Sequence, residues 1–208
     1  HGHVAVGHCR YSTTGSSVWE NAQPTFRSTA TGSLALAHNG NLVNTDELAR
    51  LVEKRRTESG QLPYPDAGRV RSTSDTDLVT ELLADYPDRS IEAAAMEVLP
   101  QLAGAFCFIF MDEGALYAAR DPRGIRPLVL GRLERGWVVA SETAALDIVG
   151  ASFIREVEPG ELIAVDEHGL RTQRFAPAQP AGCVFEYVYL ARPDTTIAGR
   201  SVYSAREE

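Results

Sequence analysis

Cysteine is scarce in this sequence, no apolar run is long, and basic residues do not predominate. The three cysteines, Cys9, Cys107 and Cys183, are widely and irregularly spaced. We therefore expect neither a disulfide framework nor a zinc motif, but a reducing, cytoplasmic compartment. No apolar run approaches the roughly 20 residues that span a bilayer. Acidic residues outnumber basic ones by 28 to 20, giving a net charge of -8, which argues against nucleic acid or an anionic membrane as a partner.

The two ends lack the usual marks of a complete chain. The sequence begins with His1 rather than Met, without a basic-then-apolar leader or a cleavage site. It stops on the charged stretch Ser201 to Glu208. We expect an internal piece of a longer protein.

What is present is a globular composition with many short strands. Hydrophobic residues fill 44% of the 208 positions, which suits one domain with a sizeable core. Runs rich in aromatic and β-branched residues predict strands. They are Val4 to Cys9, Leu34 to His38, Ala105 to Met111, Ala115 to Ala119, Leu128 to Leu130, Trp137 to Ser141, Leu162 to Val165 and Val184 to Leu190.

Capping residues predict four helices. Three begin at Asn44, Ser74 and Ser90, and the fourth, Ala144 to Val149, is capped by Ser141 or Thr143 and ended by Gly150. Two strands come first, helices follow, and the rest is mostly strands. This segregated order predicts an α+β fold in which helices cover antiparallel sheets.

Arg10 stands where a predicted strand ends and a loop of small residues, Arg10 to Pro24, begins. Ordered loops of this length are often lids or binding loops. A guanidinium at a strand end suits a carboxylate, which it holds by two parallel hydrogen bonds; the alternative is an ordinary surface arginine. Because neighbours in a strand point to opposite faces, we expect Cys9 to face the core if Arg10 faces a ligand.

The run His38-Asn39-Gly40-Asn41 follows an apolar strand. The Asn39 amide and the unobstructed N–H of Gly40 are two donors suited to a developing oxyanion. Asn-Gly is also a common hairpin signal. The segment Asn41 to Thr45 leads into a helix rather than a partner strand, which weakens the hairpin interpretation.

Asp75 lies in the first turn of the helix that Ser74 opens. The helix dipole keeps such a carboxylate ionised, so it can accept from a substrate ammonium group. Ordinary capping explains Ser74 and Asp77 but leaves Asp75 free. Together, Arg10, Asn39 with Gly40, and Asp75 predict a ligand with a carboxylate, an ammonium group and a carbonyl under attack, such as an α-amino acid with a side-chain amide.

Seven segments together resemble the amidophosphoribosyltransferase family (glutamine phosphoribosylpyrophosphate amidotransferases): GHCRYSTTGSSVWENAQP, AHNGNL, TSDTD, RDPRGIRPLVLG, SETAALD, EPGEL and EYVYLARPDTTIAGRSVYSAR. The similarity runs from His1 to Arg206. The related domains of glucosamine-6-phosphate synthase and asparagine synthetase share the HNG or NG and SDT elements but not EYVYLARPD.

The resemblance implies a class II glutaminase domain with the four-layer αββα sandwich of N-terminal-nucleophile hydrolases. It implies that Arg10 binds the α-carboxylate of L-glutamine, that Asp75 binds its α-ammonium, and that Asn39 and Gly40 form the oxyanion hole. The loop from Arg10 to Asn21 would close over bound glutamine.

One departure from the family matters for activity. The family's nucleophile is an N-terminal cysteine whose α-amino group acts as its base, and no such residue is present here. It would lie upstream of His1. We therefore predict that residues 1–208 alone have no glutaminase activity and need no cofactor of their own.

The resemblance also implies a second domain. Residues 1–190 would be the glutaminase domain and 191–208 the start of a linker, with Tyr203 as an interdomain contact. The missing phosphoribosyltransferase domain would bind phosphoribosyl pyrophosphate with Mg²⁺. Ammonia would then displace pyrophosphate and give 5-phosphoribosylamine, the first committed step of purine synthesis. We expect a homo-oligomer.

Cys183 stands where iron-sulfur members of the family place one ligand of a [4Fe-4S] cluster, with the other three in the second domain. A lone thiolate cannot hold a cluster, so a cluster and its absence both stay open. Cys107 is predicted to be a core residue. Arg120, Arg123 and Arg126 surround a turn, and packing or subunit contacts suit them better than a phosphate site.

Three other functions stay open. The first is another class II amidotransferase, against which Glu186 to Asp194 argues. The second is a glutamine-binding module without catalysis. The third is a papain-like hydrolase that uses Cys9 with His38.

Overall fold

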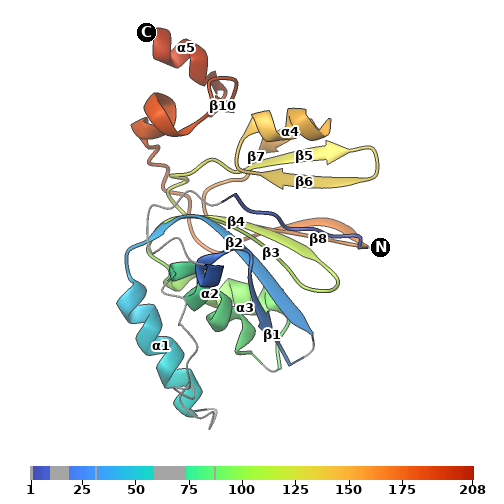
Figure 1. Ribbon diagram of the computed structural model, residues 1–208, viewed down its shortest axis with the longest axis vertical. Coiled ribbons are helices and arrows are strands. Elements are labelled where there is room, and N and C mark those ends of the chain that lie inside the picture. Colours follow the sequence, from blue (N-terminus) through green and yellow to red (C-terminus); the bar gives the residue numbers. More distant parts are fainter. Residues whose placement is uncertain (1, 10–18, 31, 59–73, 87) are drawn as a thin grey trace.

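The computed structural model describes residues 2–9, 19–30, 32–58, 74–86 and 88–208. Two antiparallel sheets lie face to face, with helices on their outer sides (Figure 1). The expectation of an α+β fold with antiparallel sheets covered by helices is confirmed.

The larger sheet has six strands in the order β1-β2-β3-β4-β8-β9, and every neighbouring pair is antiparallel. The strands are β1 (Thr25–Ser28), β2 (Ser33–Leu42), β3 (Gly104–Met111), β4 (Leu116–Arg120), β8 (Glu161–Asp166) and β9 (Gly169–Arg174). A short 3-10 helix, η1 (Trp19–Asn21), precedes β1.

Helices cover one face of this sheet. They are α1 (Thr45–Glu58), α2 (Asp75–Ala84) and α3 (Ile91–Val98), which continues into the 3-10 turn η2 (Leu99–Gln101). Alternation along β3 sends Phe106, Phe108 and Phe110 into the core beneath these helices, each fully buried. Cys107 and Ile109 point to the opposite face. The strand is therefore covered on both sides.

The smaller sheet has the order β6-β5-β7 and packs against that opposite face. Its strands are β5 (Val129–Leu133), β6 (Gly136–Ala140) and β7 (Ser152–Glu156). Cys107, Leu128, Leu130 and Ile163 form the core between the sheets. Helix α4 (Thr143–Val149) covers the outer side of the smaller sheet, and Gly150 ends it with φ 70°.

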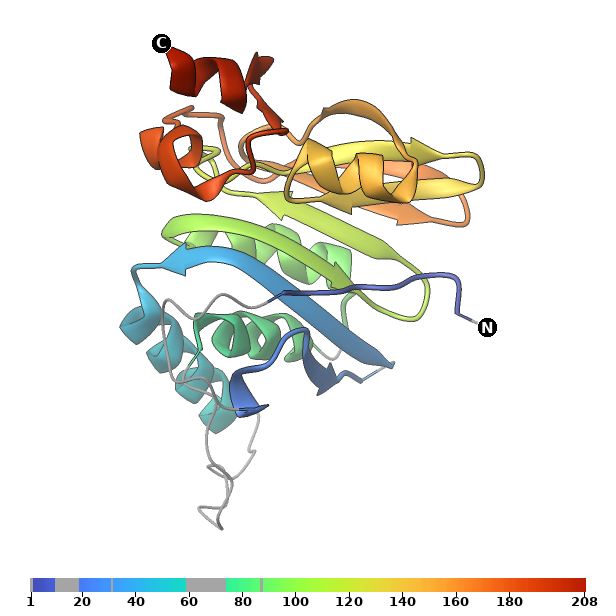
Figure 2. The same cartoon turned by 45° about the horizontal axis from the view of Figure 1, so that its top comes forward.

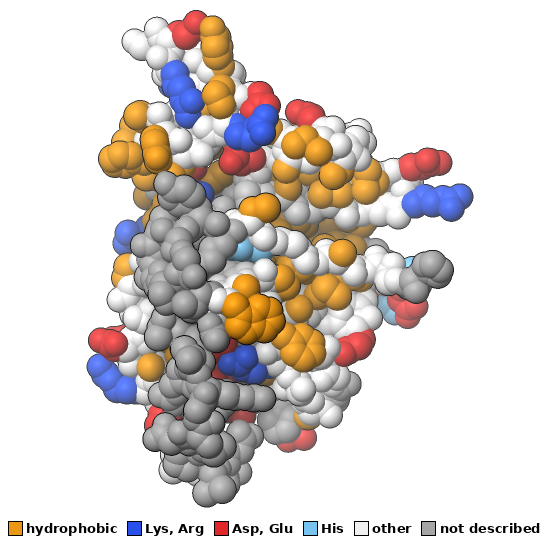
Figure 3. Space-filling view, in the orientation of Figure 1, with side chains coloured by type: hydrophobic (Ala, Val, Ile, Leu, Met, Phe, Trp, Pro, Cys, Tyr) orange, Lys and Arg blue, Asp and Glu red, His pale blue; other side chains and the backbone are white. Residues whose placement is uncertain are grey.

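The C-terminal segment forms a separate small cluster at one end of the molecule (Figure 2). It contains η3 (Glu186–Leu190), β10 (Thr196–Ile197), β11 (Arg200–Ser201) and α5 (Val202–Glu207). Several apolar side chains on η3 reach the surface, where Figure 3 shows an orange group over this end. Tyr203, the expected interdomain contact, is 58% exposed. In the described part of the chain, no helix is long and apolar enough to cross a membrane.

The sequence-based prediction omits the strands β1, β7, β9, β10 and β11 and the helix α5. It is wrong at three further places. Val4 to Cys9 is not a strand: its residues alternate between exposed and half-buried, but no described strand pairs with them. Val184 to Leu190 is not a strand either, because η3 is a π-helix closed by the Ala191 N–H bonding to the Glu186 carbonyl.

The third failure is the cap of α4. Its N-cap is Glu142, which makes no side-chain cap bond, rather than Ser141 or Thr143. The Glu142 carboxylate instead accepts from the Arg192 N–H and the Thr195 hydroxyl, and the Thr143 hydroxyl accepts from the Thr196 N–H. Glu142 and Thr143 therefore hold the C-terminal segment in place.

Candidate functional site

The candidate site lies on an open edge of β2. Strand β1 pairs with β2 only from Ser33 to Leu36, whereas β2 continues to Leu42 along β3 on its other side. Backbone N–H groups alternate between the two edges of a strand. Those of residues 38, 40 and 42 therefore point toward the edge that β1 leaves open.

Most of the backbone polar groups on this edge make hydrogen bonds with side chains. The Gln23 Oε1 accepts from the His38 N–H at 2.7 Å, and Asp75 Oδ2 accepts from the Leu42 N–H at 3.0 Å. His8 Nε2 lies 3.2 Å from the His38 carbonyl oxygen. Among the described residues, none accepts a hydrogen bond from the Gly40 N–H. One free donor therefore lies between two occupied ones.

Gly40 needs to be glycine at this position. Its φ is 153°, and a Cβ there would overlap the Ala105 carbonyl and lie 2.8 Å from His38 Nε2. Gly40 pairs with Phe106 within the β2–β3 ladder. The Asn-Gly pair is therefore part of a continuous strand. The alternative interpretation of this pair as a hairpin turn is wrong.

The Asn39 side chain leaves β2 on the face turned to the smaller sheet, opposite to its neighbour His38. Its cross-strand partner is Cys107, which also faces that sheet. Asn39 Nδ2 donates to the Ser141 hydroxyl at 3.2 Å, and Arg126 Nε donates to Asn39 Oδ1 at 3.2 Å. The amide is thus held where the two sheets meet.

Asp75 is the first residue of α2, whose N-cap Ser74 accepts from the Asp77 N–H. Its Oδ1 accepts from the Thr76 N–H at 2.8 Å, while Oδ2 binds Leu42. Burial works to raise the pKa of Asp75, but the hydrogen bond and charge of His38 and the two backbone donors outweigh it and lower that pKa. Asp75 is therefore a carboxylate that stays ionised beside the open edge.

The sequence suggested a role for the His38 side chain only as a partner of Cys9. In the structure, His38 connects β2 to α2. Its side chain is 2% exposed, with Nδ1 3.5 Å from Asp75 Oδ2 and the ring 4.6 Å from that of Phe108. Within the described structure its buried Nε2 has no hydrogen-bond partner. The ring orients Asp75 and borders Gly40.

None of the three thiols combines with these groups as a nucleophile. Burial raises the pKa of Cys107 to about 12. This burial confirms that Cys107 is a core residue. Cys9 is exposed and does not face the core, whereas His8 is turned toward β2. The expectation for Cys9 depended on Arg10 facing a ligand, and Arg10 lies outside the described residues. In the described structure no hydrogen bond joins Cys9 to His38, and the papain-like arrangement is not formed.

Two of the three arginines around the turn at Asp121 to Gly124 form ion pairs within the protein. The turn is closed by the Gly124 N–H bonding to the Asp121 carbonyl. Arg120 is buried and pairs with Glu156 at 3.0 Å, and Arg126 pairs with Glu186 at 2.6 Å. Arg123 is exposed. The packing role preferred for this cluster agrees with these contacts.

The remaining predicted residues lie elsewhere. Arg10 lies outside the described residues. Cys183 is half-buried, and its carbonyl accepts from the Glu186 N–H. Gln23, Arg126, Ser141 and Glu186 were not predicted as site residues, because nothing in their local sequence marks them; only the pairing of distant segments brings them to β2.

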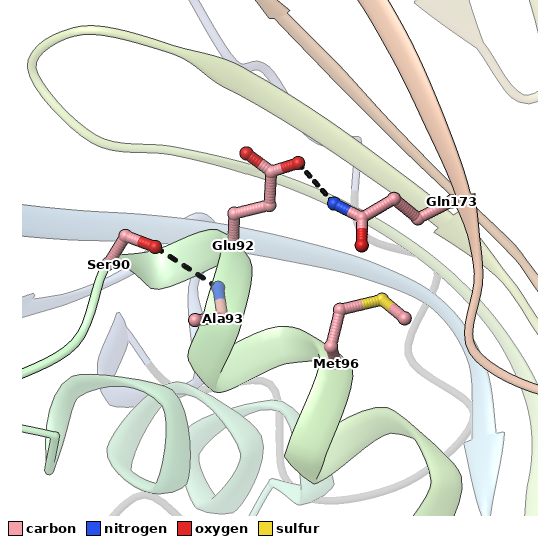
Figure 4. A pocket seen from close by; sticks show the side chains of 5 residues that line it. All are labelled: Ser90, Glu92, Ala93, Met96 and Gln173. Atoms are coloured by element: carbon pink, nitrogen blue, oxygen red, sulfur yellow. Dashed lines mark hydrogen bonds between the residues drawn. The ribbon is translucent and has the colours of Figure 1, made fainter.

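A separate open depression of about 430 Å³ lies between α3 and β9 (Figure 4). It is lined by Ser90, Glu92, Ala93, Met96 and Gln173. Its one carboxylate, Glu92, accepts from Gln173 at 2.5 Å and from Arg171 at 2.8 Å. The charge is satisfied within the protein, and none of these residues borders the edge of β2.

Comparisons with known proteins agree with this geometry. A family model described as glutamine amidotransferase domain matches residues 8–148. The chain is 61% identical over 209 residues to the amidophosphoribosyltransferase of Mycobacterium tuberculosis H37Rv, covering 100% of this chain and 38% of that protein. It is 40% identical over 208 residues to the amidophosphoribosyltransferase of Bacillus subtilis, covering 99% of this chain and 41% of that protein.

A solved structure shares the fold. It is glutamine phosphoribosylpyrophosphate amidotransferase from B. subtilis complexed with ADP and GMP, with a TM-score of 0.82 and 39% identity over 96% of this chain and 41% of that one. The chain thus spans about two fifths of the length of these relatives. It belongs to the glutamine amidotransferase family, as a class II domain of the kind found in amidophosphoribosyltransferases.

Proposed function

We propose that this domain hydrolyses L-glutamine to glutamate and ammonia. In the complete protein the ammonia would convert phosphoribosyl pyrophosphate into 5-phosphoribosylamine, the first committed step of purine synthesis. Relatives named amidophosphoribosyltransferase support the second half of this proposal. The order of helices, two sheets and helix supports an αββα sandwich of the N-terminal-nucleophile type.

The Gly40 N–H, which has no acceptor within the described part of the chain, is the observation that carries the proposal. Its neighbours at residues 38 and 42 are occupied by Gln23 and Asp75, so the edge offers one backbone donor at a defined place. As a nucleophile attacks the side-chain carbonyl of glutamine, negative charge grows on its oxygen. Gly40 N–H and Asn39 Nδ2 would stabilise that charge, Asp75 would accept from the α-ammonium, and Arg10 would bind the α-carboxylate.

The nucleophile has to come from outside the described thiols. Cys107 stays protonated at neutral pH, since burial raises its pKa to about 12, and among the described residues no hydrogen bond joins Cys9 to His38. We infer an N-terminal cysteine upstream of His1, activated by its own α-amino group. The α-amino group would take the thiol proton as the sulfur bonds to the carbonyl carbon. Collapse of the oxyanion would then break the C–N bond, and the same proton would pass to the leaving nitrogen, which departs as ammonia. Water would then hydrolyse the thioester, giving glutamate and the free thiol.

The described residues do not by themselves form either of the metal sites that the family implies. Among the described residues, no three His, Cys, Asp or Glu side chains are grouped to hold a metal. Cys183 supplies at most one of the four thiolates of a cluster, so the residues present do not fit a cluster by themselves. Iron analysis of the complete gene product tests the [4Fe-4S] hypothesis, and Mg²⁺ would bind with phosphoribosyl pyrophosphate in the second domain.

Three further expectations stay predictions. They are the boundary near residue 190, a homo-oligomer and a cytoplasmic location. The separate C-terminal cluster around Ala191, Ile197 and Val202 supports the boundary.

The decisive experiment measures glutamine hydrolysis and ammonia-dependent synthesis by the complete gene product. We expect Asn39→Ala to lower kcat for glutamine about 10²- to 10³-fold and Asp75→Asn to raise KM for glutamine. Ammonia-dependent synthesis should be unchanged in both. Asp77→Asn is the matched control, because Asp77 lies in the same helical turn but pairs with Arg27.

Two results would contradict the proposal. Glutamine binding without hydrolysis by the wild-type protein would favour a non-catalytic module. Hydrolysis coupled to an acceptor other than phosphoribosyl pyrophosphate would indicate a different class II amidotransferase.

A further inference from the structure

The orientation of the Asn39 amide is controlled by residues far away in the sequence. Arg126 Nε donates to Asn39 Oδ1 across a separation of 87 residues, and Asn39 Nδ2 donates to Ser141 across 102 residues. Asn39 extends from the larger sheet, whereas Arg126 and Ser141 flank β5 and β6 of the smaller one. The amide is therefore held from the opposite sheet.

Arg126 determines which way this amide faces. A guanidinium carries only hydrogen-bond donors, so it can donate to a carbonyl oxygen but cannot hydrogen-bond to the NH₂ group of an amide, which also carries only donors. If the Asn39 amide were flipped, its NH₂ would meet the Arg126 Nε–H, and its oxygen would replace the donor needed at the oxyanion site. The contact with Arg126 thus keeps Nδ2 on the side where it can donate.

Arg126 is itself held at both ends. Its Nη1 donates to Glu186 Oε1 at 2.6 Å, and the Glu186 side chain is 4% exposed. Its backbone carbonyl accepts from Arg120 Nε at 2.8 Å. Arg120 is fixed in turn by Glu156 and by the Val157 and Gly124 carbonyls. The guanidinium of Arg126 therefore has little freedom to leave Asn39.

We propose that Arg126 is a positioning residue for the oxyanion donor Asn39, and that Glu186 acts through Arg126. This inference rests on the proposed glutaminase function. Glu186 is the first residue of η3, so the segment that leads to the C-terminal cluster is connected to the oxyanion site through two side chains. A movement of η3 would be transmitted to the Asn39 amide.

Two variants test the pair in the complete gene product. Arg126→Lys keeps the positive charge but has a single ammonium, which cannot serve Asn39 and Glu186 with the geometry of a planar fork. Glu186→Gln keeps the shape and removes the charge. We expect each to lower kcat for glutamine hydrolysis about tenfold to a hundredfold, with KM for glutamine changed less than about threefold, because Asp75 and Arg10 are untouched.

The double variant gives a second criterion. If Glu186 acts only through Arg126, Arg126→Lys with Glu186→Gln should lose no more activity than the worse single variant. The matched control is Arg155 with Glu161, a paired arginine and buried glutamate at 2.7 Å whose hydrogen bonds within the described structure do not involve Asn39. Glu161→Gln should reduce stability without reducing kcat.

A spectroscopic measurement does not depend on activity. In protein labelled with ¹⁵N-asparagine, the side-chain amide resonance of Asn39 is assigned by its loss in Asn39→Ala. We expect it to shift in Arg126→Lys and Glu186→Gln and to stay in place in Glu161→Gln. Unchanged kcat and an unmoved resonance in the two variants would overturn the inference. Wild-type protein without glutaminase activity would overturn the proposed function instead, and the resonance would still decide whether Arg126 orients Asn39.

Discussion

At the scale of single residues, adjacent positions of β2 require different side chains. Gly40 has to lack a side chain, since a Cβ would overlap the Ala105 carbonyl. His38 fills a buried place between Asp75 and Phe108. Asn39 points the other way and meets Arg126 and Ser141. The alternation of a strand thus distributes three neighbouring residues over an edge, a helix and a second sheet.

Gly40→Ala should lower the free energy of unfolding by about 1–3 kcal/mol, because alanine is strained at positive φ and its methyl group overlaps the backbone. Urea unfolding measures this. Gly136→Ala is the control, since a Cβ at Gly136 meets nothing within 4 Å, and its effect should stay within about 0.5 kcal/mol. Equal effects of the two substitutions would contradict the close approach at Gly40.

Asp75 should make stability depend on pH. Its pKa is lowered from the usual value of 3.8 in the folded protein, so the unfolded chain binds the proton more readily. The stabilisation is therefore fully present above the unfolded pKa and is lost as the pH falls through the folded pKa. The difference in unfolding free energy between wild type and Asp75→Asn should shrink from about pH 7 to about pH 3. A difference that grows on acidification would show that the folded pKa is raised.

At the scale of elements, local signals located the helices well. Ser74 and Ser90 accept from the N–H three residues on, as N-caps do. The predicted strand Ala105 to Met111 differs from β3 by one residue. The strand prediction for Val184 to Leu190 failed because its composition suits a strand, but no described strand pairs with it. The segment forms a π-helix instead, closed by the Ala191 N–H bonding to the Glu186 carbonyl.

Ser90→Ala should lower the free energy of unfolding by about 1 kcal/mol, because it removes the hydroxyl that accepts from the Ala93 N–H at the start of α3. Ser90→Asp should retain most of the stability, since aspartate also caps helices. Thermal or urea unfolding distinguishes them. Unchanged stability of Ser90→Ala would show that the side-chain cap contributes nothing.

At the scale of the whole molecule, the site exists only where separate layers meet. Gln23 reaches His38 over 15 residues, Asp75 reaches Leu42 over 33, and Arg126 reaches Asn39 over 87. Two sheets and one helix therefore contribute to a single strand edge. The same arrangement connects that edge to η3 through Glu186.

Residues 1–208 by themselves should not hydrolyse glutamine. They hold the proposed oxyanion donors and the carboxylate, but Cys107 is protonated at neutral pH and Cys9 is exposed without a basic partner among its described contacts. Ammonia release from glutamine measures this directly. Hydrolysis together with a glutamine-like electrophile bound to Cys9, located by mass spectrometry, would contradict it.

The sequence by itself predicted the fold class, the starts of α1, α2 and α3 and the central strands, and it indicated Asn39, Gly40 and Asp75 as candidate site residues. These follow from composition, capping and strand periodicity, which act over a few neighbouring positions. Only the tertiary structure decided that the pairing of β1 with β2 ends at Leu36, which leaves the Gly40 N–H without an acceptor among the described residues, and that Gln23, His38 and Arg126 surround the site. Those features depend on strand pairing and on contacts between distant segments, and no local pattern encodes such contacts.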